Sequence, residues 1–244
     1  MSWTVRPVID ATLGARLAAH PEFQVQGEVA DRVLFTNGSW DREILVGVPG
    51  HEAINGSLFG LVELIDNNPL VCADVFSVPS AGATLGLIGL GPLIRAGLIL
   101  EDPVVQLSFE SESADLMPGL REMGWDKGVV LSSDPQDLGS VRAAVCMAEI
   151  DLMDDYSELD GLFEESYGRS FFVRGVDALE WDAEQVRGLD HAAYSLRVSS
   201  FEDRALVTVL VMADADGKCG AAQVAHAMNV MCGFEECLGL KVPG

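Results

Sequence analysis

Basic residues are scarce in this chain, and lysine is the scarcest of them. Lys127, Lys218 and Lys241 are the only lysines, and 15 basic residues stand against 38 acidic ones, which gives a formal net charge of −23. A surface this negative repels the phosphates of nucleic acids and the headgroups of anionic lipids. We therefore expect neither a nucleic-acid partner nor a membrane partner.

The cysteines do not follow a disulfide or metal-binding pattern. Their number is odd and most lie in apolar stretches, which is typical of reduced thiols in a cytoplasmic protein. Cys232 and Cys237 lack a second pair of ligands at zinc spacing, so no structural metal is expected. No basic, apolar and small-residue leader opens the sequence, and this also favours a cytoplasmic location.

The longest apolar run, residues 83–100, is too interrupted for a membrane span. Glycines, Pro92 and Arg95 break it, and it falls at the lower length limit of a spanning helix. With 49% hydrophobic residues the chain has enough apolar side chains for a packed core. We predict a buried core helix over residues 83–96.

The order of the predicted elements favours an α+β fold with an α/β front part. In the front part, helical spacing predicts helices over residues 9–19 and 51–66, and apolar runs predict strands over residues 23–29, 32–36, 43–48 and 70–76. An acidic turn joins the first two strands, and Asn67, Asn68 and Pro69 stop the second helix. Later the strands are longer: we predict them over residues 104–109, 129–132, 141–149, 171–174, 192–200 and 205–212, with helices over 116–123, from 157 and over 219–231.

Three stretches carry a family likeness. Residues 78–99 (VPSAGATLGLIGLGPLIRAGLI) match an N-P-G-C-Y-P-T signature with its following P-L-[LI]-x-A-G-L-I tail. Residues 171–193 match an F-V-R element and a V-x-G-x-x-x-C-D strand start, and residues 218–240 match a closing K-G-A-A-x-Q helix. The segment from Asp41, DREILVGVPGHEA, is a weaker fourth match. In this order the motifs resemble those of the N-acetyl-γ-glutamyl-phosphate reductases.

The resemblance implies a division of the chain into three parts. Residues 1–80 form a shortened Rossmann-like portion, and residues 81–217 form a semialdehyde-dehydrogenase-type dimerisation domain with a mixed or antiparallel sheet. Residues 218–244 contribute a C-terminal helix that packs back on the first portion. The family's sheet supports a dimer or a tetramer, so a homo-oligomer is expected.

The resemblance also implies a cysteine nucleophile that this chain lacks at the matching position. Reductases of this family attack an acyl phosphate with a thiolate, and NADPH then reduces the thioester. The nucleophile position falls on Ala81, whose methyl group forms no thioester. Ser80 is its neighbour, but a serine needs an activating base, and Cys72 lies in a predicted strand where a structural thiol is the plainer interpretation.

Other parts of the family's chemistry are also missing. No histidine lies between Phe109 and Val141, where the general acid/base belongs. Glu110 and Glu112 occupy the loop that matches the family's phosphate-binding segment, and like charges there repel an acyl phosphate. His191 lies at a predicted strand start inside the likeness; a structural role is favoured over a site role. His51 follows the family's P-H pattern, again with packing as the favoured role.

A dinucleotide cradle is not evident either. Residues 1–50 contain no G-x-G-x-x-G spacing, and the portion before the nucleophile signature is shorter than in the family. Gly86, Gly89 and Gly91 lie inside the apolar helix, where close helix packing explains them better than phosphate binding. No cofactor is therefore expected.

An acidic segment over residues 149–165 allows two interpretations. Asp151, Asp154 and Asp155 would suggest a cation site, but they lack the glycine and terminal glutamate of a calcium loop. A solvated acidic surface is favoured, and such a surface also suits a basic protein partner.

We take the retained packing motifs and lost chemistry as indications of a non-catalytic homologue, a pseudoenzyme. It would act as an oligomeric scaffold or binding subunit, with itself or with another protein of the same pathway. One alternative is a repurposed enzyme that uses Ser80, Glu110, Glu112 and His191 in the inherited cleft. Another is a residual NADP-dependent reductase that converts an acyl phosphate to a semialdehyde.

Overall fold

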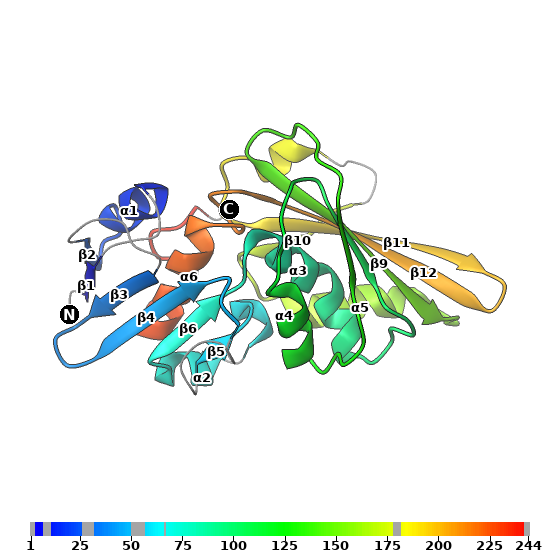
Figure 1. Ribbon diagram of the computed structural model, residues 1–244, viewed down its shortest axis with the longest axis horizontal. Coiled ribbons are helices and arrows are strands. Elements are labelled where there is room, and N and C mark those ends of the chain that lie inside the picture. The colour runs from blue at the N-terminus through cyan, green and yellow to red at the C-terminus, as the bar shows by residue number, and fades with distance from the viewer. Residues whose placement is uncertain are drawn as a thin grey trace.

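The computed structural model describes residues 3–6, 11–25, 32–49, 57–65, 67–177 and 182–241, which build two mixed sheets (Figure 1). The first sheet contains, in spatial order, β2 (Phe23–Val25), β1 (Trp3–Arg6), β3 (Arg32–Thr36), β4 (Asp41–Val46), β6 (Val75–Val78) and β5 (Leu58–Phe59). The second contains β10 (Val173–Gly175), β11 (Ala192–Phe201), β12 (Arg204–Asp214), β9 (Val141–Asp151), β7 (Val104–Leu107) and β8 (Val130–Ser133). Parallel and antiparallel pairs occur in both sheets, which confirms the predicted α+β class with an α/β front part.

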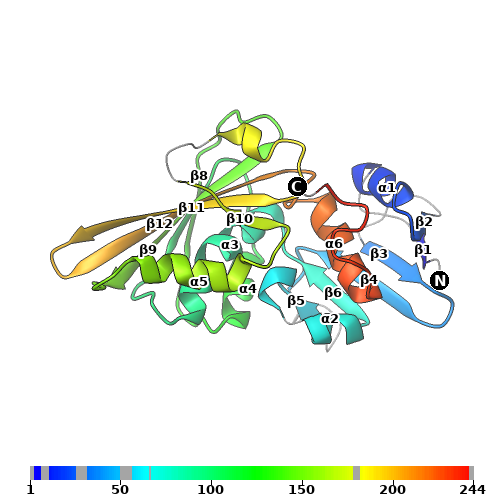
Figure 2. The same ribbon diagram turned by 180° about the vertical axis from the view of Figure 1, so that it is seen from behind.

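The helices divide between the two sheets. Beside the first sheet lie α1 (Ala11–Ala18), α2 (Asn67–Cys72) and α6 (Ala221–Cys232), and beside the second lie α3 (Ala81–Arg95), α4 (Leu116–Glu122) and α5 (Ser157–Tyr167). Short 3-10 turns cover Val62–Leu64 and Ala183–Gln185. Figure 2 shows α6, from the C-terminal part of the chain, lying across the face of the first sheet, where it contacts α1, α2 and β6.

The apolar run of the sequence forms α3, and this helix is buried along nearly its whole length. A helix that is apolar on all sides is stable only when it is covered on all sides. Its glycines allow the close approach: a Cβ added at Gly89 would lie 2.6 Å from Cys146 Sγ, and one at Gly86 would lie 2.7 Å from a Leu116 methyl carbon. The prediction of a core helix whose glycines serve packing is therefore confirmed.

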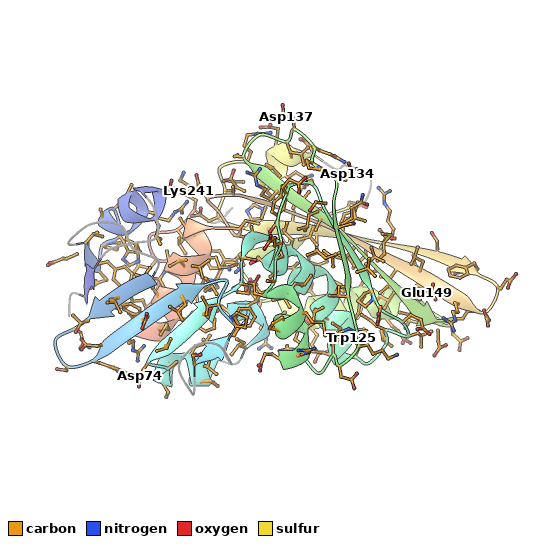
Figure 3. All side chains as sticks on the ribbon, viewed as in Figure 1. Asp74, Trp125, Asp134, Asp137, Glu149 and Lys241 are labelled. Carbon is orange, nitrogen blue, oxygen red and sulfur yellow. The ribbon has the colours of Figure 1, made fainter. Side chains whose placement is uncertain are left out.

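The second sheet has two different faces. Alternate residues of β9 and β12, such as Cys146 and Val209, are buried in the core that contains α3. The intervening residues Val145, Met147, Leu206 and Leu210 point to the other face and are partly exposed. β11 and β12 form a hairpin that is closed by the pair Phe201 and Arg204. Glu149, labelled in Figure 3, lies on the neighbouring strand β9 and pairs with Leu206 of β12.

Three predictions for the front part are wrong in the region 57–76. The helix expected over residues 51–66 is replaced, in its described part, by β5 and the turn Val62–Leu64; residues 51–56, with His51, lie outside the described residues. Asn67, Asn68 and Pro69 begin α2 instead of ending a helix, because proline is tolerated in a first helical turn. The strand expected over 70–76 is divided between the end of α2 and the start of β6, since so short an apolar run does not separate helix from strand.

The expected pairing of the first two strands is also wrong. β1, which the sequence did not indicate, lies between β2 and β3 and pairs with both. β1 and β2 are parallel, and α1 is the connection between them. The order is therefore a small strand–helix–strand unit, for which hydrophobic alternation gives no signal because β1 and β2 are so short.

Candidate functional site

The start of α3 lies at the carboxyl edge of two parallel strands. β6 ends at Val78, Ser80 is the N-cap residue, and Ala81 is the first residue of the helix. β4 runs parallel to β6 and is followed by Gly47, whose N–H donates to the Val78 carbonyl. In α/β sheets such an edge is where ligands bind, so the residues around Ala81 form the candidate site.

Asp115 holds the start of α3 from another element. Its Oδ2 accepts a hydrogen bond of 2.7 Å from the Ser80 backbone N–H, and its Oδ1 accepts one of 2.6 Å from the Ser80 hydroxyl. Asp115 directly precedes α4 and is only 2% exposed. Its carboxylate therefore stands where the positive end of the α3 dipole attracts an anion. No pattern in the sequence singled out Asp115 as a site residue.

The loop between β7 and α4 packs against the first turn of α3. The hydroxyls of Ser111 and Ser113 lie 2.8 Å apart, and a Cβ added at Gly82 would lie 1.9 Å from Ser113 Oγ. Ser113 adopts a φ of 38°, which residues other than glycine rarely adopt. Glu110 and Glu112, also in this loop, are exposed.

The four residues suspected for a repurposed enzyme do not form one hydrogen-bonded group. Ser80 bonds to Asp115, while Glu110 and Glu112 point to solvent. His191 is buried just before β11, where burial lowers its pKa and nearby Arg174 lowers it further. Within the described residues, the Nδ1 atom of His191 has no hydrogen-bond partner.

A cavity of about 210 Å³ opens beside the start of α3. Its wall combines the ends of β4 and β6, part of α1, and the first turn of α6. No charged side chain lines it within the described part of the chain; the lining residues are Leu13, Val46, Val78, Pro79, Ala215, Cys219, Gly220, Ala221, Gln223 and Val224. The amide of Gln223 is already engaged, because its Nε2 donates to the Pro79 carbonyl and its Oε1 accepts from Thr84.

Cys219 brings a thiol to this cavity from the loop that precedes α6. Its Sγ lies 3.9 Å from the Ala81 carbonyl oxygen, a weak contact at most. Burial raises the pKa of the Cys219 thiol to about 12, although Arg142 and Lys218 act in the opposite direction. At neutral pH the group is therefore a thiol and not the thiolate that nucleophilic attack requires.

No other cysteine of the described residues lines this cavity. Cys146 is fully buried between β9 and α3, with its Sγ 3.9 Å from the Leu85 carbonyl oxygen. Burial raises its pKa to about 12. Cys72 is exposed at the end of α2.

Neither a metal cluster nor a membrane helix occurs in the described residues. No three His, Cys, Asp or Glu side chains there are grouped so as to hold a metal ion, and this includes the acidic segment 149–165. None of the described helices has the length and apolar character needed to cross a bilayer.

Comparison with known proteins gives related reductases and a related fold, although no family model matches the sequence. N-acetyl-gamma-glutamyl-phosphate reductase of Archaeoglobus fulgidus is 32% identical over 233 residues, which cover 83% of this chain and 68% of that protein. The enzyme of the same name from Marinobacter nauticus is 30% identical over 123 residues, covering 48% of this chain and 34% of that protein. Crystal structures of aspartate semialdehyde dehydrogenase II from Vibrio cholerae, alone and complexed with ASA, match with TM-scores of 0.63 and 0.62. Each match has 9% identity and covers 95% of this chain and 98% of that chain, so it establishes the fold alone.

Proposed function

Because this chain belongs to the N-acetyl-gamma-glutamyl-phosphate reductase family, we propose that it is a member that no longer performs the reductase reaction and serves as an oligomeric scaffold or binding subunit. The observation that carries the proposal is the start of α3. Ala81 supplies a methyl group there, and the Asp115 carboxylate occupies the helix end that would otherwise stabilise a thiolate or an oxyanion. An anionic acyl phosphate is repelled by the same carboxylate.

The cavity beside the site does not fit a dinucleotide. Its volume of about 210 Å³ lies below the roughly 300–1,000 Å³ of most ligand pockets. Its described lining is apolar, with no cation for a phosphate and with the Gln223 amide already bonded. We therefore propose that the protein works without NADP.

A second candidate function is favoured by the position of Cys219. This thiol lies beside the Ala81 carbonyl and lines the cavity, so it is the group best placed to replace the missing nucleophile. It would support residual NADP-dependent reduction of an acyl phosphate. The raised pKa of Cys219 counts against this function, because a protonated thiol is a poor nucleophile.

A reductase assay separates the two candidates. With N-acetylglutamate semialdehyde, phosphate and NADP⁺, we expect no NADPH formation above the buffer rate and no saturable binding of NADPH. We expect Ala81→Cys to stay inactive as well, because Asp115 still holds the helix start. An active family member is the positive control; since loss of a nucleophile costs several orders of magnitude, a wild-type rate within about 10³-fold of it contradicts the proposal.

Should activity appear, Cys219→Ser identifies its source, with Cys72→Ser as the matched exposed control. Loss of activity in Cys219→Ser alone would establish the second candidate. Equal activity in both variants would reject the non-catalytic proposal and would also exclude Cys219 as the nucleophile.

The partly exposed face of the second sheet supports the proposed self-association. Val145, Met147, Leu206 and Leu210 form an apolar area on this face, in a chain that otherwise carries a charge of −23. Native mass spectrometry is expected to show a dimer or tetramer, and added salt should favour it by screening the repulsion between copies. Leu206→Glu should shift the protein to monomer, whereas Val71→Glu, at an exposed apolar residue of α2, should not. A wild-type monomer at all salt concentrations would contradict an oligomeric role.

A further inference from the structure

A buried charged cluster lies between the turn Val62–Leu64 and α6. Lys218 Nζ donates to Glu63 Oε1 over 2.6 Å, and the two side chains are 1% and 3% exposed. His226 of α6 faces the same carboxylate, with its Nδ1 3.7 Å from Glu63 Oε1. The ring of Phe172 covers the cluster, 4.1 Å from the His226 ring between centroids.

The hydrogen bonds assign one neutral form to His226. Its Nε2 lies 3.1 Å from a Glu236 carboxylate oxygen, which is an acceptor, so Nε2 carries the proton. Nδ1 then presents a lone pair toward Glu63, and neither Nδ1 nor Glu63 Oε2 has a hydrogen-bond partner in the described structure. Nδ1 and Glu63 Oε1, both acceptors in this form, lie 3.7 Å apart.

We infer that His226 is a proton-operated switch that sets the position of the first turn of α6, and with it Cys219 and one wall of the cavity. A proton on Nδ1 turns the acceptor into a charged donor, for which 3.7 Å is too long; a charge-assisted bond to Glu63 needs about 2.7–2.9 Å. Closing this gap brings the imidazolium toward the site that Lys218 occupies on Glu63 Oε1. Lys218 directly precedes Cys219, and α6 begins at Ala221 after the N-cap Gly220, so displacement of the Lys218 ammonium group moves the start of the helix.

The groups that face His226 come from three directions. Glu63 comes from the turn Val62–Leu64, Lys218 from the loop after β12, and Glu236 from the segment after α6. Burial lowers the pKa of His226; the bond to Glu236 raises it, and the Lys218 charge lowers it. Because the folded pKa lies below the usual value, the observed arrangement is fully stable above that value and loses stability as the pH falls through the interval between the two.

Hydrogen exchange read by mass spectrometry tests the switch directly. After division by intrinsic exchange rates, we expect the peptide over residues 215–226 to exchange about tenfold faster at pH 5 than at pH 7.5. The pH midpoint of this change in exchange should equal the pH midpoint of the His226 ring measured by NMR titration. Equal corrected exchange at the two pH values, or a midpoint that differs from that of His226, would overturn the inference.

His226→Gln should remove this pH response, and His191→Gln, at another buried histidine with a lowered pKa, should keep it. If His226→Gln does not fold, the inference is still tested in the wild type, by whether the midpoint of hydrogen exchange equals the midpoint of the His226 titration. The inference concerns the cavity on which the proposed function rests, but hydrogen exchange and NMR titration measure it without any enzymatic activity. Either one can therefore fail while the other stands.

Discussion

Replacing Lys218 by methionine is expected to lower the free energy of unfolding by about 3–5 kcal/mol. The substitution keeps most of the apolar stem but removes the ammonium group that lies 2.6 Å from Glu63 Oε1. Glu63 is then left in the protein interior without its cation, and a buried unpaired carboxylate is costly. Urea unfolding at pH 7.5 measures the loss. Lys127→Met, at an exposed lysine, should change the free energy by no more than about 0.5 kcal/mol.

Substituting Glu63 and Lys218 together tests whether the stability depends on the ion pair. Burial acts to raise the pKa of Glu63, but the charge and the hydrogen bond of Lys218 hold this pKa below its usual value. In the Lys218→Met variant the pKa should rise, so the loss should shrink as the pH falls and Glu63 takes up a proton. Glu63→Met combined with Lys218→Met should recover most of the stability, because an apolar pair needs no partner. A single variant that loses less than about 1 kcal/mol would show that the ion pair is not buried as described.

The sequence predicted those elements whose own residues determine them. α3 is one, because its apolar side chains and glycines require burial whatever surrounds it, and the end of α6 is another, because Gly233 adopts a left-handed φ of 70°. β11 and β12 were also predicted, since a long alternating pattern on each side of a short turn leaves one pairing.

The partners of the site were not predictable in the same way. Ser80 and Asp115 are 35 positions apart, and an aspartate directly before a helix normally caps that helix, whereas here it bonds to α3. Lys218 and Glu63 are 155 positions apart, and residue 63 falls in a segment for which the sequence predicted a helix. Such contacts depend on the packing of the two sheets against each other, and hydrophobic periodicity does not indicate which distant residues this packing brings together.

Replacing Asp115 by alanine is expected to lower the free energy of unfolding by about 2–4 kcal/mol, because two hydrogen bonds to a carboxylate are lost at once. The favourable charge at the positive end of α3 is lost with them. Asp115→Asn keeps an acceptor for the Ser80 N–H and should lose about half as much. Asp134→Ala is the matched control, because this aspartate is exposed in the loop after β8 (Figure 3).

Inorganic phosphate distinguishes an occupied anion position from a merely structural contact. If the Asp115 carboxylate fills the place of an anion, then phosphate should stabilise Asp115→Ala and leave the wild type unchanged. At a phosphate concentration ten times the dissociation constant the gain is about 1.4 kcal/mol, which a shift in the urea midpoint resolves. Equal stabilisation of both proteins would mean that Asp115 does not block the end of α3. The loss of reductase chemistry would then rest on Ala81 and on the small apolar cavity, without a contribution from Asp115.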